Sequence, residues 1–263
     1  MIKAKKSLGQ NFLVDKNIID KIVNTVEIKN KTILEVGPGT GNLTSSILEK
    51  EPKKVFVVEK DNNLVSLLKR NFQDELVIIN DDILKCDENS ICDEKLIVFG
   101  NLPYNISTEI LCKWILNIDN NNIWFSDLIL MFQKEVADRI ISNYNSSKYG
   151  RLSILANWRL NIKKIIDIKP NSFSPKPKID STLILFSPKK KFFELKNPCN
   201  LEKITRIFFS HRRKMIKKPL NQIFLDQSKN ILSKLNIDDN LRPQNLDFET
   251  YYKLTSEYEK LRS

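Results

Sequence analysis

The sequence predicts an α/β protein with a mostly parallel seven-stranded sheet, helices on both faces, and a small all-helical domain at the C-terminal end. Two observations support this fold class. Short apolar runs alternate with segments whose apolar residues recur at helical spacing, from about residue 33 to residue 141. Such alternation is typical of a parallel sheet covered on both faces. Beyond about residue 190 the pattern changes to a basic, helical tail.

The strands and helices follow one another in a regular order. The first strand covers 33–36 and leads through a glycine loop into a helix that contains Leu43, Ile47 and Leu48. The further strands of the parallel part are predicted at 54–61, 75–82, 95–104 and from 128, and helices at 15–23, 63–72, 106–116 and up to 141. Residues 152–160 are predicted to be helical, and strands at 163–170 and 181–188 to pair antiparallel at one sheet edge. We expect two domains, 1–190 and 191–263.

Composition restricts the functional class. The chain has 263 residues, 41% of them hydrophobic, and a net charge of +11, which favours a polyanionic partner. The chain has four cysteines without a C-x-x-C pair and a single histidine, which argues against a metal site, and reduced thiols suit the cytoplasm. No apolar run is long enough to span a bilayer, and no signal segment is evident. We expect a cytoplasmic monomer without metal.

The segment Gly37-Pro38-Gly39-Thr40-Gly41 lies between a predicted strand and a helix, where glycines allow the backbone to approach a ligand closely. Its G-x-G-x-G spacing differs from the G-x-G-x-x-G of a dinucleotide fold. Glu59 ends the next strand and can accept from ribose hydroxyls, and Asp82 ends the third strand and can accept from an adenine amino group. The pattern predicts a nucleoside site for NAD or S-adenosylmethionine, with Asp81 competing with Asp82.

The segment 99–107, FGNLPYNIS, follows another apolar strand. Pro103 biases Leu102 towards extended geometry, which turns the carbonyl of Leu102 or Pro103 outward. That carbonyl and the side-chain oxygen of Asn101 provide two acceptors for an exocyclic amine of a nucleobase, and Tyr104 provides a stacking face. Two acceptors direct the amine's lone pair at an electrophile, so the reaction needs positioning more than acid–base chemistry.

Residues 201–220 are predicted to form one helix that ends at Pro219. Its apolar face would comprise Leu201, Ile204, Ile207, Phe208 and Met215. Its basic face would bind RNA phosphates through Arg206, Arg212, Arg213, Lys214, Lys217 and Lys218, although an ordinary solvated face is the competing interpretation.

Six motifs together resemble the ribosomal RNA adenine N6-dimethyltransferases: GQNFL, EVGPGTG, GNLPYNIS, FQKEVADR, YGRLS and FSPKPKIDS. The resemblance runs from about Lys5 to beyond Arg213 and is closest to the small-subunit type. It implies a Rossmann-like class I methyltransferase fold with S-adenosylmethionine as donor and S-adenosylhomocysteine as product. It also implies dimethylation of two adjacent adenosines in the 3′-terminal hairpin loop of small-subunit rRNA, with pre-30S particles as partner.

The resemblance also implies roles for individual residues. Asn11 and Leu13 line the donor site, Gly37 and Gly39 contact the donor, Glu59 holds the ribose and Asp82 the adenine. Asn101 touches both the donor and the target amine, with Leu102, Pro103 and Tyr104 completing the catalytic loop. Phe173, in the loop stiffened by two prolines, is the expected second face for the target base.

Two other functions are compatible with these motifs. One is the macrolide-resistance type of methyltransferase, which modifies an adenosine of large-subunit rRNA. The other is a non-catalytic RNA- or DNA-binding assembly or transcription factor with the same fold. Intact Glu59, Asp82 and the segment Asn101-Leu102-Pro103-Tyr104 favour a catalyst over the second alternative.

Overall fold

The computed structural model describes residue 5, residues 9–118 and residues 123–262. Contacts divide the chain into two compact units. The sheet unit comprises the chain up to residue 114 with residues 118–137 and 161–188, and the helical unit comprises residues 115–117, 138–160 and 189–263. The sequence predicted a single boundary at residue 190, which stays a prediction, whereas residues 138–160 group by contacts with the helical unit. Residues 138–160 join the helical unit because their helix packs on helices near the C-terminal end, where the Tyr252 hydroxyl donates to the Ile154 carbonyl at 3.3 Å.

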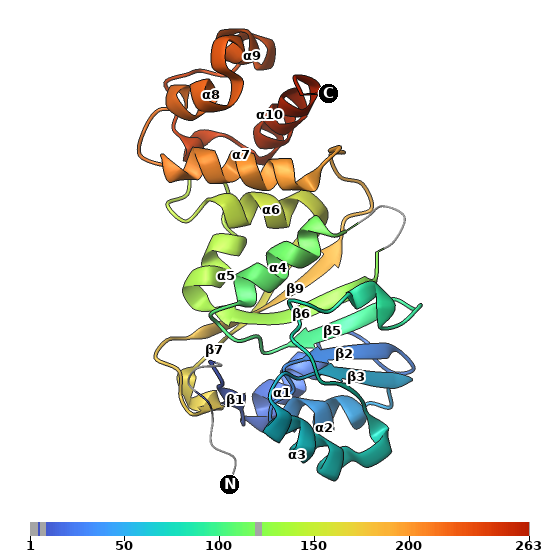
Figure 1. The fold of residues 1–263 in the computed structure, drawn as a ribbon. Helices are drawn as coiled ribbons and strands as arrows, with labels where there is room; N and C mark the ends of the chain where they lie inside the picture. The colour runs from blue at the N-terminus through green and yellow to red at the C-terminus, as the bar shows by residue number, and fades with distance from the viewer. Residues whose placement is uncertain (1–4, 6–8, 119–122, 263) are drawn as a thin grey trace. The chain divides into compact units, whose positions relative to one another are not determined.

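The sheet unit contains a seven-stranded sheet in the order β4-β3-β2-β5-β6-β9-β7 (Figure 1). Strands β4, β3, β2, β5 and β6 are parallel, and β9 runs antiparallel to β6. The predicted fold class is therefore confirmed. The strands are β2 (Thr32–Val36), β3 (Lys54–Val58), β4 (Val77–Ile79), β5 (Leu96–Gly100), β6 (Phe125–Gln133), β7 (Leu160–Ile168) and β9 (Ser181–Pro188).

A second, two-stranded sheet was not predicted. In it β1 (Phe12–Leu13) pairs antiparallel with β8 (Phe173–Ser174), so that Leu13 lies opposite Phe173. The pairing joins a segment near the N-terminal end to the loop before β9. It therefore fixes the backbone path of two segments that are distant in the sequence.

Helices cover both faces of the seven-stranded sheet (Figure 1). The helices that follow or precede its strands are α1 (Lys16–Val23), α2 (Asn42–Leu48), α3 (Asn62–Phe72), α4 (Ser107–Leu116) and α5 (Lys134–Ile140). Asp15 caps α1 as predicted, because its carboxylate accepts from the backbone N–H groups of Asn17 and Ile18. Short 3-10 turns lie at Gln73–Glu75, Glu88–Ser90, Pro170–Ser172, Leu225–Gln227 and Pro243–Asn245.

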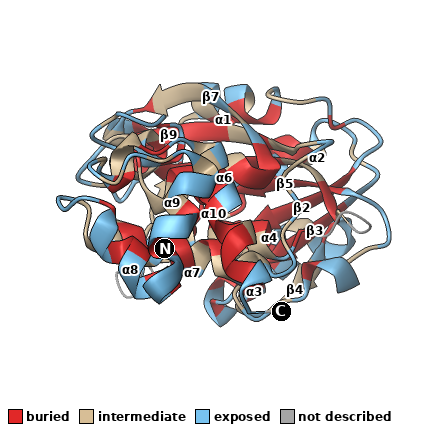
Figure 2. Cartoon of the chain, turned by 90° about the horizontal axis from the view of Figure 1, so that it is seen from above, coloured by how far each residue is buried: buried red, intermediate tan, exposed pale blue. Residues whose placement is uncertain are grey.

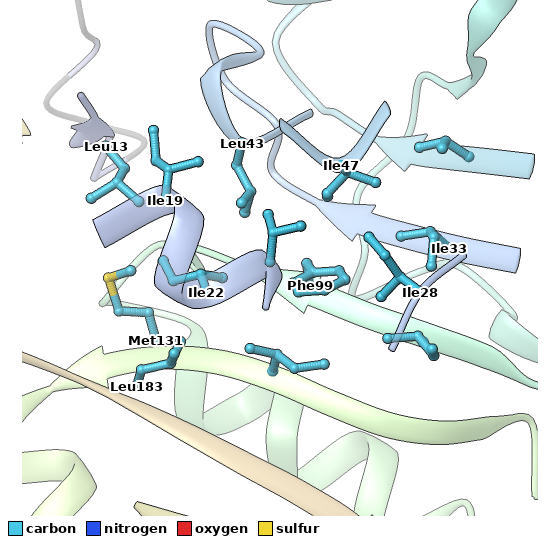
Figure 3. Close-up of a cluster of buried hydrophobic side chains, with 14 of the residues drawn as sticks. Leu13, Ile19, Ile22, Ile28, Ile33, Leu43, Ile47, Phe99, Met131 and Leu183 are labelled. Atoms are coloured by element: carbon cyan, nitrogen blue, oxygen red, sulfur yellow. The ribbon is translucent and has the colours of Figure 1, made fainter. Parts of the chain in front are cut away.

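The core of the sheet unit lies where α1 and α2 meet the strands (Figure 3). Ile33 on β2 and Phe99 on β5 face Ile22 of α1 and Ile47 of α2, and all four are at most 2% exposed. Every residue of β2 and β5 is buried, as Figure 2 shows. Such near-continuous apolar runs are expected for central parallel strands. This burial makes the ends of β2 and β5 rigid supports for the residues that follow.

The helical unit contains α6 (Arg151–Arg159), α7 (Pro198–Ser210), α8 (Lys217–Phe224), α9 (Ser228–Leu235) and α10 (Phe248–Lys260). The predicted single helix over 201–220 is therefore wrong, because a turn at residues 211–214 separates α7 from α8. Pro219 lies in the first turn of α8, where a missing N–H is tolerated, and does not end a helix. Met215 is 55% exposed, whereas Leu201, Ile204 and Phe208 are buried as predicted. No helix in the described residues has the length and apolarity needed to span a membrane.

One carboxylate interrupts the apolar sequence of β2. Glu35 is 2% exposed, and its Oε2 accepts from the Thr44 hydroxyl at 2.6 Å. Burial raises the pKa of Glu35 to about 7, although the Thr44 hydrogen bond opposes the shift and nearby Glu59 adds to it. The folded protein therefore binds a proton at Glu35 over a pH range in which the unfolded chain has already released it.

We predict that Glu35→Gln gains stability relative to the native sequence as the pH rises. Because the folded pKa is raised, the native protein loses stability between the ordinary pKa of 4.5 and about 7, and glutamine mimics the protonated form. The free energy of unfolding of both proteins should be measured with urea at about pH 5 and about pH 8. Between these two pH values, the difference between them should change in favour of the variant by about 1–3 kcal/mol. The same change at exposed Glu75 is the control, and a pH-independent Glu35→Gln difference would contradict the prediction.

Candidate active site

Four candidate site residues lie together because four neighbouring strands end at the same edge of the sheet. Gly37 follows β2, Glu59 follows β3, Asp82 follows β4 and Asn101 follows β5, and these strands are adjacent and parallel. A cavity of about 360 Å³ opens there and is lined by all four residues. Its size lies within the range of about 300–1,000 Å³ typical of small-molecule sites. The carboxyl edge of a parallel sheet is where such folds bind ligands.

The glycine loop forms one wall of this cavity. Gly37 has φ +70° and Gly39 has φ +60°, a region that favours glycine. A Cβ on Gly39 would lie 2.8 Å from Cδ1 of Phe12, whereas a Cβ on Gly37 would meet no atom nearer than 3.9 Å. Gly39 is therefore required by both its conformation and its neighbour, and Gly37 chiefly by its conformation.

The Glu59 carboxylate is fixed by backbone donors. Its Oε1 accepts from the Asp61 N–H at 2.8 Å and its Oε2 from the Gly39 N–H at 3.4 Å. Glu59 is 7% exposed, and burial raises its pKa despite these hydrogen bonds. This places a rigid acceptor beside the glycine loop.

Asp81 and Asp82 both line the cavity, but they differ in burial and in partners. Asp81 is exposed, whereas the Asp82 side chain is 16% exposed and accepts from Lys60 Nζ at 2.7 Å. The Lys60 hydrogen bond, together with one from the Leu84 N–H, lowers the pKa of Asp82. Asp82 is thus the more firmly positioned acceptor, and it is ionised near neutral pH.

The segment before α1 forms a second wall. Asn11 and Leu13 line the cavity, and the Leu13 carbonyl accepts from Asn42 Nδ2 at 2.7 Å. The Asn11 carbonyl accepts from Asn101 Nδ2 at 2.8 Å. This last contact determines which way the Asn101 amide points, because its nitrogen is committed and its oxygen is left to accept from another group.

The loop that follows β5 also lines the cavity through Asn101, Leu102, Pro103 and Tyr104. The Tyr104 hydroxyl lies 2.6 Å from Ser181 Oγ, which ties the ring to β9, and burial raises the Tyr104 pKa. The Pro103 carbonyl accepts from the Ile106 N–H at 3.1 Å within the turn that leads to α4. Of the two carbonyls considered from the sequence, this engagement favours that of Leu102 as the acceptor.

Phe173 is placed differently from the expectation. Its side chain is 1% exposed, belongs to the hydrophobic cluster with Leu13 and Ile168, and is not among the residues that line the cavity. The reason is the β1–β8 pairing, whose register directs Phe173 into the core. In this structure Phe173 is therefore packed in the core, and its role as the second face for the target base stays a prediction.

The basic residues of the tail lie in the helical unit. Arg206, Arg213, Lys214, Lys217 and Lys218 are exposed. Arg212 is half-buried and donates from Nη2 to the carbonyls of Ser146 and Ser147. Arg212 therefore anchors the loop before α6, a role that the sequence did not indicate.

Several lining residues lie outside the positions predicted from the sequence. Phe12, Glu35 and Lys60 belong to the lining. Phe12 and Lys60 are adjacent in sequence to residues that were predicted, and Glu35 lies two positions before the glycine loop. A wider window around each motif would have included all three.

Comparison with known proteins assigns the chain to a family. A family model described as ribosomal RNA adenine dimethylase matches residues 1–260. Ribosomal RNA small subunit methyltransferase A of Pelagibacter ubique (strain HTCC1062) is 66% identical over 261 residues, covering 99% of both chains. A dimethyladenosine transferase from Plasmodium falciparum superposes with a TM-score of 0.80 at 29% identity, covering 95% of this chain and 98% of that one. The 23S rRNA methyltransferase ErmE shares the fold, with a TM-score of 0.68 at 21% identity over 96% of this chain and all of that one. A cavity with this lining at the carboxyl edge of the sheet, and matches that span almost the whole chain, place this protein in the ribosomal RNA adenine dimethylase family.

Proposed function

We propose that this protein transfers methyl groups from S-adenosylmethionine to N6 of two adjacent adenosines in the 3′-terminal hairpin loop of small-subunit rRNA. The observation that carries the proposal is the fixed Asn101 amide at the rim of a nucleoside-sized cavity. The 66% identity to a small-subunit methyltransferase supports the choice of substrate. We further propose that the protein acts as a monomer on assembling small subunits in the cytoplasm, without a metal ion.

The residues of the cavity fit S-adenosylmethionine. Buried Glu59 has the chemistry to accept from both ribose hydroxyls, and Asp82 to accept from the adenine amino group. The glycine loop and the backbone of Asn11 and Leu13 leave space for the methionine part. When bound, this cofactor supplies an electrophilic methyl group on a sulfonium centre. The protein residues then have to bind and orient the second reactant.

Asn101 and Leu102 are proposed to hold the target amine. The lone pair of an adenine N6 is delocalised into the ring, and acceptance of its two N–H bonds by the Asn101 Oδ1 and the Leu102 carbonyl favours tetrahedral geometry at nitrogen. Stacking on Tyr104 would fix the ring plane, a contact worth about 1–3 kcal/mol per base. Because these residues act by orienting the target amine, no general base of unusual strength is required.

A second transfer to the same nitrogen is compatible with this loop. After one methylation the amine retains a single N–H, so one of the two acceptors loses its partner. Asn101 and a peptide carbonyl are neutral, and the loss of one hydrogen bond costs less than it would for a buried carboxylate. An unpaired loop nucleotide can be extruded from its stack more cheaply than a base in a duplex.

The exposed basic residues of the helical unit are proposed to bind rRNA phosphates. Arg206, Arg213, Lys214, Lys217 and Lys218 can each release condensed counterions on binding. Such contacts set affinity and position, and the shape of the rRNA loop would set specificity.

Labelled donor tests the proposal directly. Purified protein, tritiated S-adenosylmethionine and small subunits from a strain that lacks the dimethyladenosines should give labelled rRNA, with the label mapped to the 3′ region by mass spectrometry. Label in large-subunit rRNA alone would favour the resistance-type alternative. Particles that bind the protein and stay unlabelled would favour the non-catalytic alternative.

We predict that Asn101→Ala abolishes most methyl transfer and preserves particle binding. The variant lacks one of the two acceptors and should lower the transfer rate at saturating donor by about 100-fold or more. Filter binding of the particles should be unchanged, because the change lies in the sheet unit. Asn24→Ala, at the end of α1 and away from the cavity, is the matched control. A fully active Asn101→Ala protein would refute the proposed mechanism.

The role of the tail is tested by salt dependence. Arg213→Ala combined with Lys214→Ala should weaken particle binding and reduce the slope of log K against log salt by about 1.5, because two phosphate contacts are lost. Lys69→Ala with Arg70→Ala on α3 removes the same charge from exposed positions in the sheet unit and is the control. Equal slopes for both double variants would show that these tail residues do not contact the rRNA backbone.

A further inference from the structure

We propose that Lys113 is a positioning residue for the donor site: its ammonium group fixes the loop at residues 82–88, which forms the adenine-side wall of the cavity. The inference rests on the proposed function, because it takes this cavity as the donor site. Lys113 itself does not line the cavity. It would act through the loop whose first residue, Asp82, is the proposed partner of the adenine amino group.

The loop after β4 begins with a tight turn around Asp82. The Asp82 carbonyl accepts from the N–H groups of Lys85 at 2.8 Å and Cys86 at 3.1 Å, and the Asp82 Oδ1 accepts from the Leu84 N–H at 3.1 Å. Ile83 and Leu84 belong to the cavity lining together with Asp82. The N–H groups of the turn donate to Asp82. The carbonyls of Ile83 and Cys86 have their hydrogen-bond donor outside the turn.

Lys113 satisfies both of these carbonyls. Its Nζ donates to the Ile83 carbonyl at 2.9 Å, to the Cys86 carbonyl, and to Glu88 Oε1 at 2.7 Å. An ammonium group has three N–H donors, so these three contacts use its whole capacity. The three acceptors lie along one stretch of the loop, and a single cation from α4 therefore holds both ends of the turn.

Glu88 completes this arrangement as a buried counter-ion. It is 3% exposed, and its Oε1 also accepts from the Trp114 indole N–H at 2.7 Å. Trp114 is 1% exposed and packs edge-on against Trp124 with ring centroids 5.5 Å apart. Glu88 is thus fixed from two successive residues of α4, which prevents the loop from sliding along the helix.

The helix that provides Lys113 also begins directly after the catalytic loop. Asn101–Tyr104 lead through a turn into α4 at Ser107, and Lys113 lies on that helix. The adenine-side wall and the catalytic loop are therefore both attached to α4. Removal of the ammonium should displace the wall relative to the rest of the cavity and weaken the binding of the donor's adenosine part.

Calorimetric titration with S-adenosylhomocysteine tests this inference on the full chain. For Lys113→Met, which keeps the length of the side chain, we expect the dissociation constant to rise about tenfold. The transfer rate at saturating donor should stay within about twofold of the native value, because Asn101, Leu102 and Tyr104 are unchanged. A general loss of structure would instead lower that rate as well.

Lys134→Met is the matched control. Lys134 is half-buried, pairs with Asp167 at 2.7 Å in the same unit, and does not line the cavity. Its variant should bind S-adenosylhomocysteine as the native protein does. If Lys113→Met does not fold, Glu88→Gln keeps the volume of the side chain and removes the counter-charge, and it should weaken binding by about threefold.

Three outcomes would count against the inference. Native affinity in the folded Lys113→Met protein, or in Glu88→Gln where that variant is needed, overturns it and leaves the proposed function intact. The same holds if Lys113→Met and Lys134→Met weaken binding equally. A native protein that binds no S-adenosylhomocysteine would overturn the proposed function, and this inference with it.

Discussion

The common direction of four neighbouring strands is the constraint on which the site depends. Strands β4, β3, β2 and β5 lie side by side and are parallel, so the residues that follow them emerge at one edge. Gly37, Glu59, Asp82 and Asn101 come together for this reason although no two of them are close in the sequence. An antiparallel strand at any of these places would carry its polar residue to the opposite edge. The site is therefore a consequence of topology, and the buried apolar strands that fix the topology are also what fixes the site.

The contacts that hold this site are mostly made to main-chain atoms. Glu59 accepts from two backbone N–H groups, Asn101 donates to the Asn11 carbonyl, and Lys113 donates to two loop carbonyls. A reaction that relies on the orientation of two reactants benefits from groups that do not have to reorganise. The main-chain partners of Glu59 supply this rigidity because they directly follow β2 and β3, whose positions are set by the sheet. The protein therefore needs few side chains of special reactivity, which agrees with a site that contains no histidine among its lining residues.

The sheet and most of the candidate site could be predicted from the sequence, and the long-range contacts could not. The strand ends at Glu59 and Asp82 follow from alternating apolar runs, and the glycine loop follows from its spacing. The burial of Phe173 depends on its pairing with Leu13, a contact between distant segments that no local pattern records. The turn that divides α7 from α8 interrupts residues with continuous helical periodicity. Lys113 was missed because two of its three partners are carbonyls, which every residue possesses, and the third, Glu88, lies 25 positions away.

The hydrogen bond from Asn101 to the Asn11 carbonyl has a consequence for how such chains can diverge. Any amino acid at position 11 offers the same carbonyl, so this contact tolerates replacement of the side chain there. An insertion or deletion between Gly9 and Leu13 would instead move a different peptide group into place and release the amide from its orientation. This contact therefore constrains the length of the segment and hardly constrains the amino acid at position 11. Sequence variation at that position would give little indication of the contact.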